Sequence, residues 1–189
     1  MKVILGVSNR HVHLTEKTYK KLFGEKPLEV AKKLRQPEQF ASNRFVTIKT
    51  EAGEINKVRV VGPLRKYNQV EISKTDSYLL KINPPIRESG NIKGSCPITI
   101  IGDSGEVHLK EGCILANRHI HITPDEIKKY NLENIKKVKI KINGKKPGIL
   151  ENVYLKIAKK SKLELHLDTD DSNAFNVKTG QKFEIIIEK

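Results

Sequence analysis

The 189-residue sequence contains no tryptophan, and aromatic residues make up only 5% of it. Because single-stranded nucleic acid usually binds by stacking its bases on aromatic side chains, this scarcity argues against such a ligand. No window approaches the roughly 20 consecutive apolar residues of a membrane-spanning helix. The segment from Met1 to Gly6 is too short for a secretory signal peptide. We therefore expect a cytoplasmic protein that does not bind a membrane.

Cysteine is almost absent as well. Cys96 and Cys113 have no Cys-X-X-Cys spacing, which argues against a disulfide framework and a thiolate zinc site, and we interpret both as packing residues. The sequence also lacks a Gly-X-Ser-X-Gly elbow, a Walker loop and a Rossmann glycine fingerprint. Without a nucleophile motif, any reaction is expected to proceed by direct attack of one bound substrate on another.

Positive charge is in excess, with 36 lysines and arginines against 22 acidic residues and a formal net charge of +14. Such a field favours anionic partners, which include phosphorylated metabolites, coenzyme A and nucleic acid. The basic residues are spread along the chain and do not form a tail, so we interpret most of them as solvated surface.

Short runs of alternating apolar and polar residues dominate the sequence, and turn residues such as Asn143-Gly144 separate several of them. This spacing is typical of antiparallel strands in a β-sandwich or β-barrel. The predicted strands are 45–49, 57–61, 69–72, 98–101, 137–142 and 182–187. We further predict short helices from Thr15 to Gly24, from Thr123 to Tyr130 and near Leu28 to Leu34. Pro124 and the Thr123 to Glu126 capping-box spacing define the start of the second helix.

An internal repeat is the most informative feature. The segment 9–15 (Asn-Arg-His-Val-His-Leu-Thr) recurs at 117–123 as Asn-Arg-His-Ile-His-Ile-Thr, with five identities in seven positions. A fainter match aligns the segment around Glu71 with the segment around His166, and each is followed by an Asp-Ser pair. The chain therefore resembles two related β units.

The repeated His-X-His pairs predict a metal site. In an extended segment the side chains at i and i+2 project from the same face, so each copy places two imidazoles side by side. If the repeat alignment holds, Glu71 and His166 supply a third ligand to each pair. Three protein ligands with one open position are typical of catalytic zinc, although cobalt, iron or nickel could occupy the same geometry. The predicted ligands are His11, His13 and Glu71, and His119, His121 and His166.

The remaining histidine and three arginines have less specific patterns. His108 has no partner motif, and we predict that it lies at the surface. Arg65 follows a Gly-Pro turn six residues before Glu71, and its guanidinium either binds phosphate oxygens or is an ordinary surface group. Arg10 and Arg118 should point away from the metal face and make structural or interdomain contacts.

Four segments together resemble the PduL-type phosphate propanoyltransferases. They are Gly6 to Leu14, Gly62 to Ser73, Asn117 to His121 and Glu164 to Asp170, and they follow the family's order over nearly the whole chain. The resemblance implies an enzyme that interconverts an acyl-CoA plus phosphate with an acyl phosphate plus CoA. Acetyl and propanoyl groups are both plausible substrates. By residue matching, Arg65 corresponds to the family's phosphate-contacting arginine, and the six predicted ligands hold two zinc ions.

The resemblance also implies a mainly β fold with two small β-barrels, related by the internal repeat and capped by short helices. One domain is expected at 10–116, with a helical insertion near 15–40, and the second at 1–9 with 117–189, completed by the N-terminal strand. The two zinc ions are expected between the barrels. Many relatives carry an extension that targets bacterial microcompartments, and its absence here favours a protein free in the cytosol.

Two alternatives stay open at this point. The same metal cluster could activate water in a binuclear metallohydrolase, or a basic, metal-stabilised barrel could bind nucleic acid. The favoured partners are acyl-CoA or CoA and phosphate or acyl phosphate, with a homodimer allowed and no nucleic acid expected.

Overall fold

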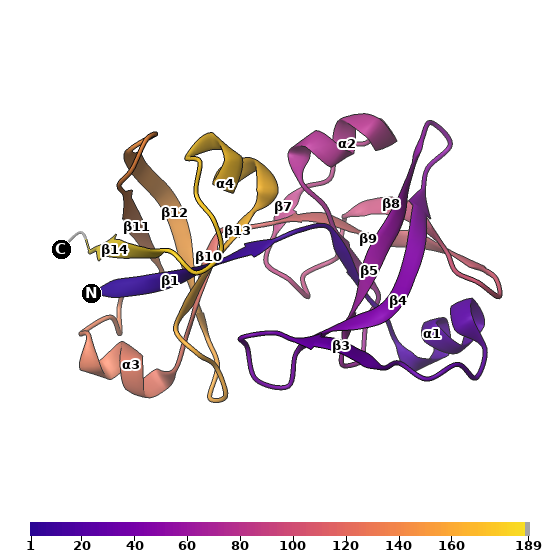
Figure 1. The fold of residues 1–189 in the computed structure, drawn as a ribbon, viewed down its shortest axis with the longest axis horizontal. Helices are drawn as coiled ribbons and strands as arrows, with labels where there is room; N and C mark the ends of the chain where they lie inside the picture. Colours follow the sequence, from indigo (N-terminus) through magenta and orange to yellow (C-terminus); the bar gives the residue numbers. More distant parts are fainter. Residues whose placement is uncertain (188–189) are drawn as a thin grey trace. The chain divides into compact units, whose positions relative to one another are not determined.

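The computed structural model describes residues 1–187, and these divide between two compact units (Figure 1). The terminal unit consists of Met1–Asn9 and Asn117–Lys189, and the central unit consists of Arg10–Ala116. The chain therefore passes from the terminal into the central unit between Asn9 and Arg10 and returns between Ala116 and Asn117. Both crossings fall at a copy of the repeated motif.

The terminal unit contains a closed six-stranded barrel. Its strands are, in order around the barrel, β1 (Lys2–Ser8), β13 (Glu164–Asp168), β10 (His119–Ile122), β12 (Gly148–Ile157), β11 (Lys137–Ile142) and β14 (Lys182–Ile186). Successive side chains along each strand point alternately into the barrel and out of it. In β11, for example, Val138, Ile140 and Ile142 are buried in the core of this barrel, while the lysines between them lie on the outer side.

The central unit contains a second six-stranded barrel, which closes because β8 pairs with both β4 and β9. Its strands are β4 (Phe40–Lys49), β5 (Glu54–Gly62), β2 (His11–His13), β6 (Gln69–Glu71), β9 (Glu106–Ala116) and β8 (Cys96–Ile101). Two short strands extend the sheet, β3 (Val30–Lys33) beside β4 and β7 (Ile86–Arg87) beside β9. A separate apolar core, which includes Val12 and Ile48, fills this barrel.

The two barrels have the same pairing scheme. In the central unit β2 is antiparallel to β6 and parallel to β5, and in the terminal unit β10 is antiparallel to β13 and parallel to β12. Likewise, β6 runs parallel to β9 as β13 runs parallel to β1. The prediction of a mainly β fold with two barrels related by an internal repeat is confirmed. The strands that carry the repeated motif are β2 and β10. Strand β2 belongs to the central unit although β1, which precedes it, belongs to the terminal unit, and β10 belongs to the terminal unit although β9 belongs to the central one.

Two helices follow the motifs directly, as predicted. Helix α1 (Glu16–Phe23) begins after Thr15, whose hydroxyl caps the backbone N–H of Thr18, and it ends at Gly24, which has a positive φ of 62°. Helix α3 (Pro124–Lys129) begins after Thr123, which forms the predicted capping box with Glu126. In both helices the threonine side chain accepts a hydrogen bond from a backbone N–H that has no partner within the helix.

Two further helices were not predicted, although their caps can be recognised in the sequence. Helix α2 (Lys74–Leu80) follows β6, and helix α4 (Thr169–Ala174) follows β13. Ser73 and Asp168 are the respective N-caps, each accepting from the backbone N–H three residues later. Both helices are shorter than two full turns, so they show little of the apolar periodicity that indicates a helix.

An arginine from each motif binds the helix of its own unit. The Arg10 guanidinium contacts both carboxylate oxygens of Asp76 on α2, at 3.0 and 2.8 Å. Arg118 contacts both oxygens of Asp171 on α4, at 2.8 and 2.6 Å, and these bonds raise the pKa of Arg118. The prediction that Arg10 and Arg118 make structural contacts is confirmed. The aligned Asp-Ser pairs of the sequence are therefore equivalent in space as well.

The helix predicted near Leu28 to Leu34 is wrong. Residues Val30–Lys33 form strand β3 at the edge of the sheet, where Val30 pairs with Ser42 and Lys33 with Phe40. Ala31 and the lysines favour a helix locally, but hydrogen bonding to β4 outweighs that weak preference. All four residues of β3 are exposed, and the charged lysines suit an unprotected sheet edge.

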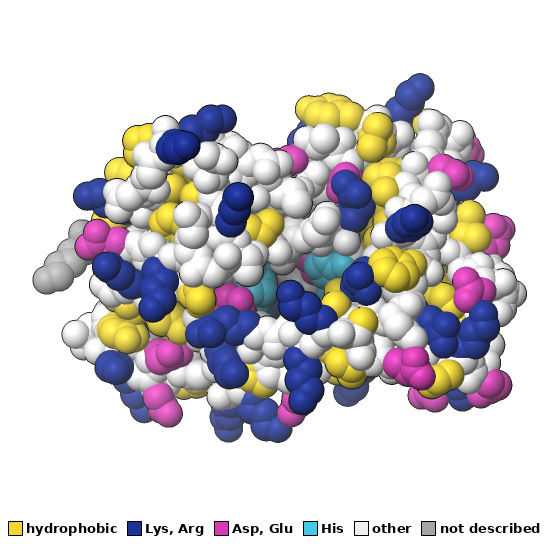
Figure 2. Space-filling view, in the orientation of Figure 1, with side chains coloured by type: hydrophobic (Ala, Val, Ile, Leu, Met, Phe, Trp, Pro, Cys, Tyr) yellow, Lys and Arg dark blue, Asp and Glu magenta, His cyan; other side chains and the backbone are white. Residues whose placement is uncertain are grey.

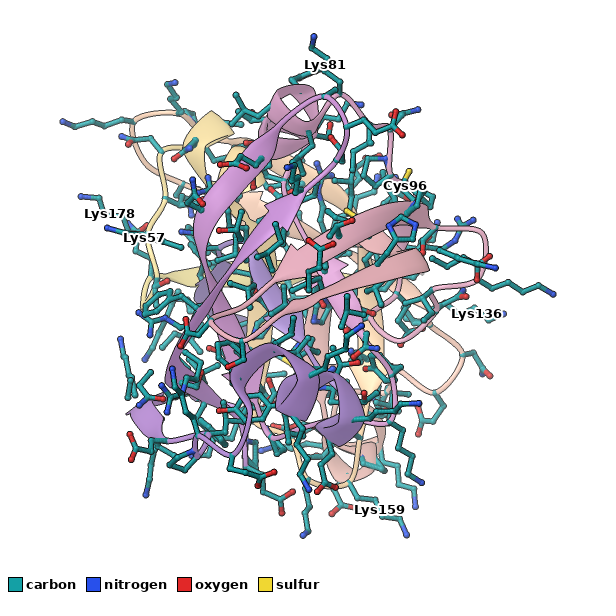
Figure 3. All side chains as sticks on the ribbon, turned by 90° about the vertical axis from the view of Figure 1, so that its right-hand side faces the viewer. Lys57, Lys81, Cys96, Lys136, Lys159 and Lys178 are labelled. Atoms are coloured by element: carbon teal, nitrogen blue, oxygen red, sulfur yellow. The ribbon has the colours of Figure 1, made fainter. Side chains whose placement is uncertain are left out.

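Basic side chains are dispersed over the face of the molecule that Figure 2 shows. In Figure 3 the labelled lysines, Lys57, Lys81, Lys136, Lys159 and Lys178, all point away from the ribbon, and each is exposed. His108 is exposed, as predicted, and its Nδ1 lies 3.1 Å from the Thr99 hydroxyl. Cys113 is buried and Cys96 is half-buried, and both are free thiols. Among residues 1–187, no helix has the length and apolar character needed to cross a bilayer.

Replacing Asp76 by alanine should destabilise the protein clearly. Its side chain is only 3% exposed, and it both pairs with Arg10 and completes the α2 capping box. We expect the free energy of unfolding to fall by about 2 kcal/mol, from a lost helix cap of about 1 kcal/mol and a partly screened ion pair. Urea denaturation followed by circular dichroism measures this loss. The matched control Asp103→Ala removes an exposed ion pair with Lys26 and should have little effect, so equal losses would contradict the assignment.

Candidate metal centres

The register between β2 and β6 assembles the first trio, which is His11, His13 and Glu71. His11 stands directly opposite Glu71 in this antiparallel pair, and His13 is on the same face because it is two residues further along. The Nε2 atom of His11 lies 3.6 Å from Glu71 Oε2, and that of His13 lies 4.0 Å from Oε1. His13 and Glu71 are buried, so the three groups meet largely out of water.

The second trio, His119, His121 and His166, forms in the same way on β10 and β13. His119 stands opposite His166, as His11 stands opposite Glu71. The ring centroid of His166 lies 5.0 Å from that of His119 and 4.6 Å from that of His121. The structure thus brings together all six predicted ligand residues as two trios, one in each unit.

The geometry of both trios fits a transition-metal ion. Within each trio, one nitrogen or carboxylate oxygen per residue lies within 4.8 Å of the others. Two nitrogens on one tetrahedral zinc ion are about 3.3 Å apart, given bond lengths of about 2.05 Å. The Nε2 atoms are 3.2 Å apart in His11 and His13, and 3.3 Å apart in His119 and His121. Three nitrogen or carboxylate donors suit zinc and leave a coordination position for a substrate.

Backbone carbonyls fix the ring orientation of one histidine in each trio. Nδ1 of His13 lies 3.1 Å from the Val61 carbonyl, and Nδ1 of His119 lies 2.9 Å from the Asn117 carbonyl. Because a carbonyl only accepts, each Nδ1 carries the hydrogen and Nε2 presents its lone pair to the trio. Burial, with the nearby charges of His11 and Arg65, also lowers the pKa of His13 well below its usual range. The ring is therefore neutral at pH 7, as a metal ligand must be.

Arg65 lies beside the first trio. Its backbone N–H donates to the Leu14 carbonyl over 2.8 Å, which ties the loop after β5 to the residue that follows β2. Its Nη1 donates to the Tyr67 hydroxyl over 2.8 Å, so the guanidinium has a fixed orientation. The positive charge of Arg65 is one of the causes, after burial and His11, that lower the pKa of His13. A half-buried cation thus stands next to three potential metal ligands.

Sequence reasoning missed one further residue beside each trio. Gln69 and Glu164 stand opposite His13 and His121, so they complete the same face of the strand pairs. Nε2 of Gln69 donates to Glu71 Oε1 over 2.6 Å, and Oε2 of Glu164 lies 3.1 Å from His166 Nε2. Both precede a predicted ligand by two positions, so the alternation that related the histidines could have revealed them.

Residues 4–178 match the family model described as phosphate propanoyltransferase. The phosphate propanoyltransferase of Priestia megaterium is 48% identical over 180 residues, which cover 94% of this chain and 82% of that protein. That of Thermotoga maritima is 42% identical, with coverage of 97% and 89%, and that of Citrobacter freundii is 39% identical, with coverage of 97% and 88%. With similarity of this extent along nearly the whole sequence, the chain belongs to the phosphate propanoyltransferase family.

Proposed function

We propose that this chain is a zinc-dependent phosphate acyltransferase that interconverts a short-chain acyl-CoA plus phosphate with an acyl phosphate plus CoA. Membership of the phosphate propanoyltransferase family supports the reaction class. The observation that carries the mechanism is the position of Arg65, an oriented cation beside a buried trio of metal-binding type. The acyl group is acetyl or propanoyl.

Two zinc ions per chain would be held, one by each trio. A zinc ion, when bound, supplies positive charge that stabilises phosphate oxygens and a departing thiolate. Glu71 brings negative charge to the first trio, and Gln69 holds its carboxylate in place by donating to Oε1 over 2.6 Å. The Nδ1 contacts of His13 and His119 keep their Nε2 lone pairs directed at the metal positions.

Arg65 would bind the phosphate. A guanidinium presents five N–H donors in one plane and matches two phosphate oxygens at once, and the Tyr67 hydroxyl engages only Nη1. Held in this way, the phosphate keeps one oxygen available for attack. Positioning of two bound reactants can contribute several kcal/mol to the rate, at roughly 7–11 kcal/mol in the best aligned cases.

The reaction itself needs no covalent contribution from the protein. An oxygen of phosphate attacks the thioester carbonyl carbon, a carbon–oxygen bond forms, and the carbon–sulfur bond breaks with its electron pair going to sulfur. The products are an acyl phosphate and the CoA thiolate, which takes a proton from water. In the reverse direction the thiolate attacks the acyl phosphate.

An assay of thiol release tests the reaction directly. With protein of measured zinc content and acetyl-, propanoyl- and butanoyl-CoA as substrates, thiol should appear only when phosphate is present, and acyl phosphate should accumulate in equal amount. A binuclear metallohydrolase would release thiol without phosphate. A nucleic-acid-binding barrel would show salt-sensitive binding of nucleic acid and no transfer.

Arg65→Ala should reduce kcat/KM by about 10²-fold, because it removes an oriented charge from the bound phosphate. The KM for phosphate should rise, and bound zinc should stay at the wild-type level because Arg65 is no ligand. Arg65→Lys should recover part of the loss, because lysine restores the positive charge but lacks the planar guanidinium group. The control is Arg35→Ala at an exposed position, which should behave as wild type. An unchanged phosphate KM in Arg65→Ala would rule out this role.

His119→Ala and His11→Ala should each reduce bound zinc from about two ions per chain to about one, because each removes a ligand from a single trio. Elemental analysis after gel filtration measures the ratio. His108→Ala removes an exposed histidine outside both trios and should leave the zinc content unchanged. If all three variants retained two ions, the ligand assignment would be wrong.

A further inference from the structure

The two cysteines of the chain lie directly opposite each other in the central barrel. Cys96 is the first residue of β8, Cys113 lies in β9, and the register of this antiparallel pair matches one with the other. Both are free thiols, and the sequence contains no other cysteine. The strand register thus brings together two residues that no sequence motif connects.

This pairing has the geometry of a disulfide. Opposite residues in an antiparallel pair have Cα atoms about 4.5 or 5.5 Å apart, and both values lie within the roughly 4.4–6.8 Å found between disulfide-linked cysteines. Their side chains project from the same face of the sheet. Cys96 packs against the apolar core to which Cys113 belongs. Burial, and after it the nearby thiol of Cys96, raises the pKa of Cys113.

A β-bulge next to the cysteines fixes their register. The pairing of β8 with β9 shifts immediately after Cys96, where β9 contains extra residues. Gly112 lies in this bulge with a φ of 156°, and its N–H donates to the Ser95 hydroxyl over 2.7 Å. The residues that precede the two cysteines are therefore hydrogen-bonded to each other. This contact holds the start of β8 against β9 and keeps Cys96 opposite Cys113.

The two thiols differ in access to solvent. Cys113 is fully buried, whereas Cys96 is half-buried at the start of its strand. A small oxidant can reach Cys96 from solvent. Since burial raises the pKa of Cys113, its reactive thiolate is scarce. Cys96 is therefore the thiol that meets an oxidant first, and Cys113 is the neighbour that can react with it afterwards.

We propose that Cys96 and Cys113 are a redox modification site, at which hydrogen peroxide produces a reversible intramolecular disulfide. The Cys96 sulfur attacks a peroxide oxygen, the O–O bond breaks, and the sulfur is oxidised to a sulfenic acid. The leaving hydroxide takes the thiol proton of Cys96 and becomes water. The Cys113 sulfur then attacks the sulfenic sulfur, the S–O bond breaks, and the leaving hydroxide takes the Cys113 proton. Two thiols are thus oxidised while one peroxide is reduced to two waters.

The disulfide would close one seam of the central barrel covalently. Strand β8 completes this barrel by pairing with both β4 and β9. A bond between Cys96 and Cys113 encloses the segment 97–112 and restricts the unfolded chain, which favours the folded state. Oxidation is therefore expected to make the central unit more resistant to unfolding.

The disulfide would form on the face of the sheet opposite the first trio. Cys113 pairs with Val70 of β6, and both are core residues. Glu71, the next residue along β6, points to the other face because side chains alternate. The cysteine pair therefore contacts none of the three predicted ligands, and its oxidation requires neither zinc nor acyl transfer. Bound zinc should be the same before and after oxidation.

Peptide mapping of the full-length protein tests the disulfide. The reduced protein is treated with hydrogen peroxide, its remaining thiols are alkylated, and it is digested with trypsin without reductant. Cleavage after Lys93, Lys110 and Arg118 places the cysteines in separate peptides, 94–110 and 111–118. These peptides should be linked in protein that runs as a monomer on a non-reducing denaturing gel, and dithiothreitol should separate them. Alkylation of both cysteines after peroxide, or crosslinks only between chains, would overturn the proposal.

Two variants test the order of the steps. In Cys113→Ala the sulfenic acid of Cys96 has no neighbouring thiol, so dimedone should trap it. In Cys96→Ala the buried Cys113 should remain a thiol under the same peroxide treatment. Oxidation of Cys113 in that variant would contradict the assignment of Cys96 as the first thiol to react. If a variant does not fold by circular dichroism, the peptide map of the wild-type protein decides the question.

Thermal unfolding tests the consequence for the barrel. Oxidised wild-type protein should have a Tm about 5 °C above that of the reduced protein, because the crosslink encloses a loop of moderate length. Cys96→Ala is the matched control, and the same peroxide treatment should not raise its Tm. Equal Tm values for the crosslinked and the reduced wild-type protein would rule out a stabilised seam.

Discussion

Both candidate centres depend on the register of one antiparallel strand pair. Because side chains alternate along a strand, pairing His11 with Glu71 and His119 with His166 puts every donor on one face. A slip of one residue would present Val70 in place of Glu71, or Leu165 in place of His166. Barrel closure opposes such a slip, because β2 is hydrogen-bonded to both β5 and β6, and β10 to both β12 and β13. The core residues Val12 and Ile120, which face inward between the histidines, hold the same register.

The repeated architecture also explains why the two centres resemble each other without being identical. Each barrel repeats the same order of features: a strand with the His-X-His pair, a capped helix, a strand with the third residue of the trio, and a second helix that binds the motif arginine. The two trios differ at Glu71 and His166. Glu71 has the neutral Gln69 two residues earlier on its strand, and His166 has the acidic Glu164 at the equivalent position. Each trio therefore has one buried carboxylate nearby, and the environments of the two centres are more alike than the ligand residues suggest.

The sequence was sufficient to predict which six residues meet in the two trios, because that inference is local. Two histidines at i and i+2 share a strand face whatever the rest of the fold does, and the repeat then located Glu71 and His166. Helices α1 and α3 were predictable for the same reason, since Thr15 and Thr123 are explicit caps. The family resemblance added the two-barrel fold, which periodicity alone left open between a barrel and a sandwich.

The features that escaped prediction depend on distant parts of the chain. Strand β3 forms because β4 offers it hydrogen bonds, against its own helical preference. The environment of Glu164 depends on Gly6, more than 150 residues earlier in the sequence, and no local pattern relates the two. Helices α2 and α4 had recognisable caps but were too short for a periodic signal.

The crossing of the chain between the two units affects how the protein can be made. Strand β1 is synthesised before the central unit, whereas both of its partners, β13 and β14, are synthesised after it. During translation β1 must therefore wait as an unpaired strand while the central barrel, whose residues emerge next, can already fold. Neither half of the gene encodes a complete barrel for the terminal unit. A nascent chain that stops before β13 leaves β1 without either of its partner strands.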